Sequence, residues 1–259
     1  MISAFVAFHN IDLDEILEPM ESFKTFNQFF CRKLKPSARI ADSADPLVAL
    51  SPADARTTVF KTVQAATQLW IKGSSFTIAS LLGSDEEARL HLLSNFSLSR
   101  ADFGPQNQAK RFEHGSLAIF RLAPQDYHRF HFPVDGVVRE TRSIDGTLFA
   151  VNPIAVRSVI DVYTENLRTV TTMDSTHFGR VAIVAIGAML TGSIVLSTKP
   201  GTMVRRMDEH GFFKFGGSTI VVLFEAGVID FSSDLLENSS QALETLVRVG
   251  SAIGGRRQV

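Results

Sequence analysis

Residues 213–224, FKFGGSTIVVLF, join a double glycine to a run that has the character of a β-strand. The β-branched, apolar residues 219–224 are typical of a buried strand. Gly216 and Gly217 weaken a strand, and such a pair usually marks a bulge or a place where another group approaches the backbone. One interpretation is a β-bulge or turn with a polar tip. The alternative is that the Gly217–Ser218 peptide bond is itself a reactant.

The composition is that of a folded protein with a sizeable core. The chain has 259 residues, of which 45% are hydrophobic and 20% are charged, enough for one large domain or two small ones. A net charge of -1 provides no overall field for nucleic acid, so we expect no nucleic-acid partner. Cys31 is the only cysteine, which excludes an internal disulfide and a cysteine-based zinc site and suits a reducing compartment.

The sequence predicts neither a secretory signal nor a transmembrane helix. Residues 1–8 lack a basic leader and run directly into an acidic segment. Residues 181–198 carry no charge and are long enough to span a membrane as a helix. However, Gly187 and Gly192 divide this stretch into two short runs, VAIVAI and SIVL, of strand length. We therefore expect any contact with a membrane to be peripheral.

The pattern along the chain predicts helices first and strands afterwards. Residues 13–34 carry apolar side chains at three-to-four spacing interrupted by Pro19, which predicts two short amphipathic helices. After Pro46, many short apolar runs separated by turn signals indicate an antiparallel sandwich or barrel. Residues 84–111 are expected to form a helix and an exposed loop, and residues 233–249 a C-terminal helix.

These expectations describe one α+β, mainly β domain over residues 1–259. Its predicted parts are a helical, membrane-facing segment (1–45), a β-rich core (46–232) and a C-terminal helix (233–259).

Aromatic and basic residues gather in the N-terminal segment. Packing of the aromatic face on the protein's own core is the simpler interpretation. Yet aromatic residues beside a basic cluster are also the composition of a helix that lies on a membrane surface. The candidate membrane-facing residues are Phe23, Phe26, Phe29, Phe30, Arg32 and Lys33.

Three types of polar side chain are those found in nucleophilic catalysis. Ser218, Asp54 and the histidine pair 128 and 131 fall on separate turns of the β region, as do the parts of a nucleophile whose base is oriented by a carboxylate. The histidines 128 and 131 are spaced like metal ligands on a helix, but prolines on both sides argue against a helix, so we expect no metal. Ordinary roles in turns are the alternative for each residue. No Gly-x-Ser-x-Gly elbow surrounds Ser218, which argues against a hydrolase.

Four segments together resemble the phosphatidylserine decarboxylase family. They are Gly216-Gly217-Ser218-Thr219, Ser51-Pro52-Ala53-Asp54, FNQFF with RKLKP in residues 26–36, and FRLAPQDYHRFHFPVDG in residues 120–136. They follow the family's order, and the similarity covers nearly the whole chain. Their residues are more similar to those of the non-mitochondrial eukaryotic branch. The resemblance implies a barrel-sandwich-like antiparallel β core with N-terminal helices applied to a lipid surface.

The resemblance also implies a self-cleaving enzyme. Ser218 would attack the carbonyl of Gly217, and the chain would be cut into residues 1–217 and 218–259 with a pyruvoyl group formed from Ser218. His131 would be the base that takes the Ser218 proton, Asp54 the carboxylate that holds its tautomer, and His128 the acid that reprotonates the product carbanion. A glycine before the bond suits this attack, because a side chain there would crowd the hydroxyl.

The implied reaction converts phosphatidylserine to phosphatidylethanolamine and carbon dioxide, with no metal or diffusible cofactor. The implied partners are phosphatidylserine in a membrane surface and the two cleaved chains with each other, and a homodimer is a further possible assembly. The implied location is intracellular and peripheral on membranes, such as those of the endosome, Golgi or vacuole.

Some residues depart from the family's pattern. Ala55 follows Asp54 where many relatives have glycine, and His114 also replaces a usual glycine. Met207 and His210 replace an expected glycine and an expected apolar residue, and residues 94–110 look like extra length. These departures leave two alternatives open: a pyruvoyl-dependent decarboxylase of a soluble amino acid, and a non-cleaving pseudoenzyme that binds lipid.

Overall fold

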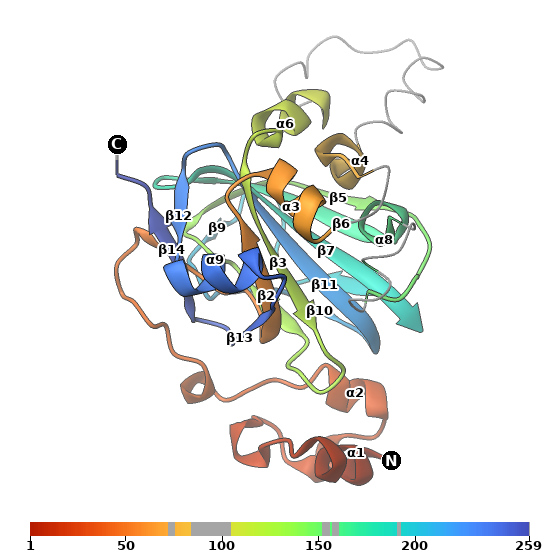
Figure 1. Cartoon of the computed structure of the whole chain (residues 1–259). Helices are drawn as coiled ribbons and strands as arrows, with labels where there is room; N and C mark the ends of the chain where they lie inside the picture. Colours follow the sequence, from red (N-terminus) through yellow and green to blue (C-terminus); the bar gives the residue numbers. More distant parts are fainter. Residues whose placement is uncertain (72–75, 84–104, 152–155, 157–160, 191–192, 259) are drawn as a thin grey trace.

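The computed structural model describes residues 1–71, 76–83, 105–151, 156, 161–190 and 193–258 (Figure 1). An antiparallel eight-stranded sheet forms its centre, and this sheet is open at both edges rather than closed into a barrel. In spatial order its strands are β13 (Thr245–Val247), β2 (Ala55–Phe60), β3 (Ser116–Leu122), β11 (Gly216–Phe224), β7 (Gly179–Leu190), β6 (Arg168–Ser175), β5 (Gly136–Ile144) and β9 (Met203–Val204). The expected α+β, mainly β fold is confirmed.

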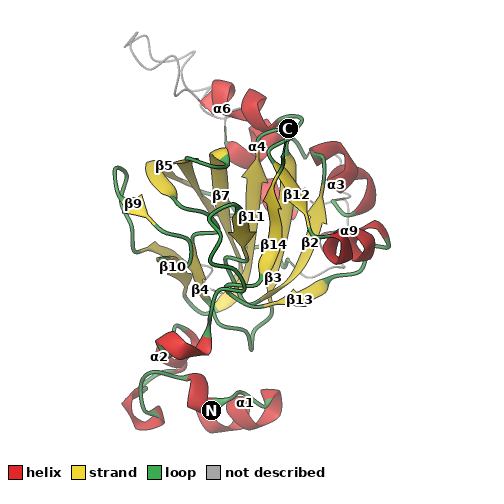
Figure 2. Cartoon of the chain, turned by 90° about the vertical axis from the view of Figure 1, so that its left-hand side faces the viewer, coloured by secondary structure: helices red, strands yellow, loops and turns green. Residues whose placement is uncertain are grey.

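Two small sheets cover one face of the central sheet and helices cover the other (Figures 1 and 2). The small sheets are β1 (Val48–Leu50), β14 (Ala252–Arg256) and β12 (Ile229–Phe231), and β4 (Arg129–His131), β10 (Glu209–Phe213) and β8 (Ile194–Leu196). Helix α9 (Ser233–Ser240) packs on their side of the core. The opposite face is covered by α3 (Val63–Leu69), α4 (Ile78–Leu82), α6 (Pro105–Phe112) and α8 (Val162–Glu165).

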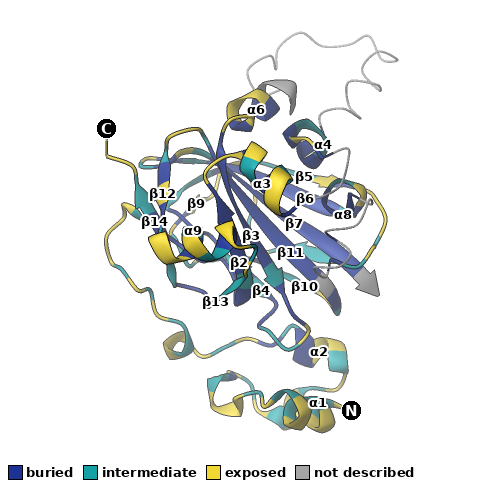
Figure 3. Ribbon diagram, in the orientation of Figure 1, coloured by how far each residue is buried: buried dark blue, intermediate teal, exposed yellow. Residues whose placement is uncertain are grey.

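Burial of both faces explains the uniformly apolar sequence of β11. Ile220, Val222 and Phe224 pack in the core under the small sheets. Val221 and Leu223, which alternate with them, pack in the core under the helices. Successive side chains of a strand point to opposite faces, so a strand covered on both sides reads as a continuous apolar run. Figure 3 shows the central strands almost entirely buried.

The N-terminal segment forms a separate layer beside one end of the central sheet (Figures 1 and 2). It contains α1 (Ile2–His9), single 3-10 turns at Leu13–Glu15, Met20–Ser22 and Pro36–Ala38, and α2 (Phe26–Phe30). Helix α2 begins at a capping box in which Thr25 and Gln28 exchange hydrogen bonds. The prediction of two amphipathic helices over residues 13–34 is therefore wrong for the first of them, which is reduced to 3-10 turns on both sides of Pro19.

Other predicted elements also differ from the structure. The C-terminal helix ends at Ser240, Ala242 adopts a left-handed φ of 56°, and residues 245–247 pair with β2 instead. The stretch after residue 181 does form strands, but β7 continues through Gly187 to Leu190. In the parts of the chain that the structure describes, no helix is long and apolar enough to cross a membrane. The predicted loop over residues 84–104 lies outside the described residues.

Candidate active site

Ser218 lies at the start of the central strand β11 and is completely buried. Its Cα is paired with Leu122 of β3 on one side and with Gly187 of β7 on the other. The register towards β7 shifts between Gly216 and Ser218: Gly216 pairs with Leu190 and Ser218 with Gly187, so the extra residue of this bulge lies on β7, opposite Gly217. Gly216 has a φ of 152°, a conformation that side chains disfavour. A bulge is therefore present beside the double glycine, but its extra residue belongs to the neighbouring strand β7, and Ser218 lies directly next to it.

The hydroxyl of Ser218 has no hydrogen-bond partner among the described residues. Burying such a group without a partner costs about 1–3 kcal/mol, so native proteins seldom do it without a functional reason. The strand alternation puts this side chain on the same face as Ile220 and Val222, beneath the small sheets. A buried, unbonded hydroxyl beside a glycine at this register shift is chemically available to react with its own backbone.

His131 lies in β4 with one ring nitrogen engaged and the other free. Its Nδ1 is 2.8 Å from the carbonyl oxygen of Met207, whereas its buried Nε2 has no partner among the described residues. Burial lowers the pKa of His131, partly offset by the Met207 carbonyl. A neutral ring that donates Nδ1–H to this carbonyl keeps a lone pair at Nε2, the arrangement of a general base.

Met207 itself occupies a backbone conformation suited to glycine. Its φ is 69°, a left-handed value that costs a non-glycine residue about 1–2 kcal/mol. The family resemblance leads us to expect glycine at this position, and a left-handed φ is a physical reason for that expectation. The strained turn aims the carbonyl of residue 207 at His131.

Asp54 is engaged by other groups than His131. Its carboxylate accepts hydrogen bonds from Nε of Arg39 at 2.9 and 3.1 Å, from Nη2 of the same arginine, and from the backbone nitrogen of Val249 at 2.9 Å. Within the described residues no hydrogen bond joins Asp54 to His131, or either of them to Ser218. The sequence analysis expects Asp54 to hold the tautomer of His131, but here the Met207 carbonyl does so.

His128 is completely buried, and neither of its ring nitrogens has a partner among the described residues. Its ring centroid lies 3.9 Å from that of Phe30 in α2. Burial, and then the nearby cation of Arg32, lower the pKa of His128 well below its ordinary value. The imidazole is therefore neutral, with both nitrogens free for a ligand.

An apolar cavity of about 600 Å³ lies where the N-terminal segment meets the start of β11. Phe26 and Phe30 of α2 and the loop after β3 form much of its wall, and Gly216 lines it next to the bulge. Phe215 closes this junction, with its ring centroid 4.9 Å from Phe26 and 5.2 Å from Phe30. An apolar cavity whose wall includes Gly216, one residue before the Gly217–Ser218 bond, is suited to an apolar substrate.

The candidate membrane-facing residues divide into two groups. Phe29, Phe30 and Arg32 are buried, so their assignment to a membrane surface is wrong: they pack inside the chain. Phe23 and Phe26 are partly buried and Lys33 is exposed. Helix α1 was not predicted from the sequence; none of its residues is buried, and Phe8 is 83% exposed. Its apolar composition was the available signal.

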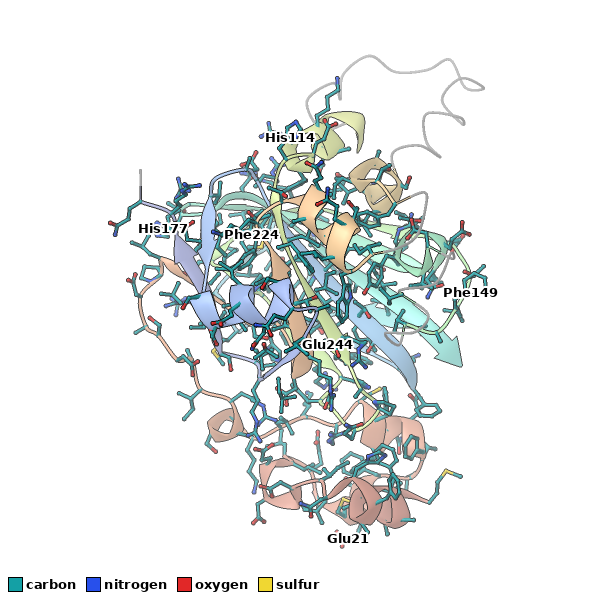
Figure 4. All side chains as sticks on the ribbon, viewed as in Figure 1. Glu21, His114, Phe149, His177, Phe224 and Glu244 are labelled. Atoms are coloured by element: carbon teal, nitrogen blue, oxygen red, sulfur yellow. The ribbon has the colours of Figure 1, made fainter. Side chains whose placement is uncertain are left out.

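His210 and His114, which both differ from the residue expected from the family pattern, lie in different parts of the structure. His210 is buried in β10, where its Nδ1 is 2.9 Å from Oγ1 of Thr198 and its Nε2 is 3.0 Å from Oγ1 of Thr171. Burial, and then His131, lower the pKa of His210 to about 3. His114 is exposed beside α6, at the end of the molecule opposite the N-terminal helices (Figure 4). Its departure from the family pattern therefore does not affect the site.

Comparison with known proteins identifies the family of this chain. The family model for phosphatidylserine decarboxylase matches residues 26–255. Phosphatidylserine decarboxylase proenzyme 3 of Schizosaccharomyces pombe is 45% identical over 254 residues, which are 98% of this chain and 24% of that protein. Proenzyme 2 of Oryza sativa is 48% identical over 246 residues, 94% of this chain and 36% of that protein.

A bacterial relative is closer in length. The phosphatidylserine decarboxylase proenzyme of Chlamydia muridarum is 40% identical over 256 residues, 98% of this chain and 77% of that protein. The chain thus spans about a quarter of the length of the fungal relative and most of the bacterial one. With the family model matching most of its residues, the chain belongs to the phosphatidylserine decarboxylase family.

Proposed function

We propose that this chain cuts itself between Gly217 and Ser218 and then decarboxylates phosphatidylserine to phosphatidylethanolamine. The observation that carries the proposal is the buried, unbonded hydroxyl of Ser218 directly after Gly217, where the register between β11 and β7 shifts. Membership of the family supports it, because relatives that align over nearly the whole chain are named proenzymes.

In the proposed cleavage, His131 is the base. Its free Nε2 takes the proton of the Ser218 hydroxyl, while the Met207 carbonyl keeps the other ring nitrogen protonated. The serine oxygen forms an ester with the carbonyl carbon of Gly217 as the peptide C–N bond breaks. Loss of the serine Cα proton and cleavage of its Cβ–Oγ bond release the Gly217 carboxylate. Water then replaces the nitrogen of residue 218, which leaves as ammonia.

The surroundings of Ser218 fit the pyruvoyl group that this sequence of steps leaves at residue 218. Gly216, two residues before Ser218, lines the apolar cavity, so a substrate in the cavity lies beside the segment that carries this terminus. A pyruvoyl group supplies an electron-accepting carbonyl for decarboxylation. His128 is the proposed source of the proton returned to the substrate carbon. Because burial and Arg32 keep it neutral, it takes up that proton when the negative charge of a substrate lies beside it.

We further propose that the two products of cleavage stay together. Residues 218–259 contribute β11, which lies between β3 and β7 of the other product. They also contribute β13, paired with β2, and β14, paired with β1. A single cut at the bulge leaves all of these pairings in place. Association of this pair into a homodimer stays a prediction.

The proposed membrane contact is made by α1. Phe8 and Met1 are 83% and 93% exposed, and Met1 and Phe5 of the same segment line the apolar cavity. Exposed apolar side chains next to the entrance of an apolar cavity suit a substrate whose acyl chains stay in the bilayer. The exposed cations Lys33 and Lys35 favour an anionic lipid surface.

The experiment that tests the function is intact-mass analysis of the purified chain. We expect a fragment of residues 218–259 that is lighter, by one ammonia, than simple hydrolysis would give. Ser218→Ala should remain whole. Thr219→Val is the matched control: Thr219 is also buried and unbonded but points to the opposite face, so its variant should still be cut. A wild-type chain that stays whole under native conditions would favour the lipid-binding pseudoenzyme.

Substrate class is tested with the cleaved protein. We expect carbon dioxide release from phosphatidylserine in vesicles and none from free amino acids. Phe8→Ser should reduce sedimentation of the protein with phosphatidylserine vesicles. Release from a free amino acid, together with no sedimentation, would favour the alternative of a soluble amino acid decarboxylase.

A further inference from the structure

Arg32 is a buried cation whose hydrogen bonds are incomplete. The residue is 5% exposed. Its Nη2 donates to the carbonyl oxygens of Gln125 at 3.1 Å and Asp126 at 3.4 Å, and the guanidinium lies 5.0 Å from the centroid of the Phe29 ring. Its Nε and Nη1 are buried and have no partner among the described residues. A buried guanidinium normally has its donors satisfied, so two free donors indicate a missing acceptor.

The acidic groups around Arg32 are committed to other partners. Asp54 is bound by Arg39 and by the Val249 nitrogen. The carboxylate of Asp126 accepts from the backbone nitrogen of Ala123 at 2.7 Å and lies 3.7 Å from Nη1 of Arg56. Consistent with this, burial is the largest influence on the pKa of Arg32 and lowers it. The protein therefore buries this charge without giving it a counterion of its own.

The position of Arg32 relates it to the candidate active site. It follows α2 directly, two residues after Phe30, which lines the cavity and contacts His128. Gln125 and Asp126, whose carbonyls bind Arg32, come directly after Ala123 and Pro124 of the cavity wall. Arg32 also lies near enough to His128 to lower its pKa. The guanidinium that carries the free donors therefore lies near His128.

We propose that Arg32 binds an oxyanion of the phospholipid headgroup through its free Nε and Nη1 donors. The inference rests on the proposed function. In phosphatidylserine the carboxylate is bonded directly to the carbon that loses carbon dioxide, and the phosphodiester follows a single methylene. Either oxyanion must lie close to the carbon that His128 serves, and so close to Arg32. The planar guanidinium presents two adjacent donors that match the oxygens of either group.

This subsite also explains how His128 can become protonated beside the Arg32 cation. In the chain as it stands, the Arg32 cation opposes protonation of that imidazole. An oxyanion on Arg32 offsets the cation, so the imidazole can take up a proton when the headgroup is present. The site then acquires its acid together with its substrate.

The test uses the cleaved, purified protein and the water-soluble lipids dihexanoyl phosphatidylserine and dihexanoyl phosphatidylethanolamine, which remove membrane binding from the measurement. Arg32→Gln should raise the KM for the serine lipid about 10- to 100-fold, as expected for loss of charged hydrogen bonds. Arg32→Lys should recover part of this loss. Lys61→Gln removes an equal charge at an exposed position and should match the wild type.

Binding of the ethanolamine lipid, measured by calorimetry, distinguishes the two oxyanions. Equal weakening for both lipids by Arg32→Gln would identify the phosphodiester, and weakening for the serine lipid alone would identify the carboxylate; both support the subsite. Binding of both lipids within twofold of wild type would overturn it. So would slowed self-cleavage with unchanged binding, because the partner of Arg32 would then be the released Gly217 carboxylate.

Two further comparisons keep the result interpretable. If Arg32→Gln does not fold, the same criteria apply to Arg32→Lys, which keeps the charge. If the wild type binds both lipids but decarboxylates neither, the proposed function fails while the binding comparison still tests Arg32.

Discussion

The ion pair between Asp54 and Arg39 provides the sharpest test of how the site is held together. Their side chains are 12% and 11% exposed, and the carboxylate accepts from both Nε and Nη2 of the guanidinium. Removing one partner of such a pair strands the other charge and costs about 3–5 kcal/mol. Glu15 lies 2.9 Å from Arg39 and still partners it when Asp54 is changed. We therefore expect Asp54→Asn to cost about 3 kcal/mol, at the lower end of that range.

The assay combines unfolding with cleavage. Urea unfolding is measured in a Ser218→Ala background, so that every variant is one chain of the same length. The double variant Asp54→Asn with Arg39→Gln should lose about 1–3 kcal/mol less than the sum of the single losses. Cleavage rates are then measured with Ser218 restored. If Asp54 acts by fixing Arg39 and the Val249 backbone, Arg39→Gln should slow cleavage as much as Asp54→Asn.

A variant of this ion pair that changes stability without changing the rate of self-cleavage would contradict this expectation. If Arg39→Gln destabilises the chain but leaves cleavage at the wild-type rate, while Asp54→Asn stops cleavage, Asp54 acts directly on His131 as the family resemblance implies. Arg111→Gln serves as the control, because its pair with Glu225 is half exposed on the arginine side. That variant should change the free energy of unfolding by at most about 1 kcal/mol and leave cleavage unchanged.

Two further predictions concern Met207 and His210. Met207→Gly should stabilise the Ser218→Ala chain by about 1 kcal/mol in urea unfolding, because glycine relieves the left-handed φ of 69°; Met207→Ala keeps the strain and should show no such gain. The pKa of His210 is lowered to about 3 in the folded chain. As the pH falls below the ordinary pKa of histidine, His210 is therefore protonated in the unfolded chain before it is protonated in the folded one. Stability is therefore lost as the pH falls, by about 1.4 kcal/mol per pH unit, and His210→Gln should show a smaller loss in urea unfolding between pH 7 and 5.

The sequence predicted the fold best where the pattern was longest. The run 219–224 forms the last six residues of β11, as expected, because a strand covered on both faces has a continuous apolar sequence. The C-terminal helix was predicted too long, because residues 245–247 continue its apolar pattern in the sequence. In the structure they pair with β2 as a strand. Sheet pairing is a long-range contact, and the local pattern does not contain it.

The site was predicted by residue type but not by partner. Ser218, His128 and His131 are buried, or nearly so, with free polar atoms, which fits reactive groups. No local pattern identifies Arg39 as the partner of Asp54, because these residues are brought together by the path of the N-terminal segment. The same folding buries Arg32, whose basic neighbours made it look like a surface residue.

The geometry of β11 explains why a strand and a double glycine stand together in the same stretch. From Ser218 to Phe224 the strand is paired on both sides, so the serine is held by its neighbours. Pairing with β3 begins only at Ser218, and the register with β7 is interrupted at residue 217. The carbonyl of Gly217 is therefore the less constrained partner in the proposed attack. Rotation of this peptide towards a fixed hydroxyl needs a backbone without side chains, whereas the apolar run must stay rigid so that the two cleaved pieces remain paired.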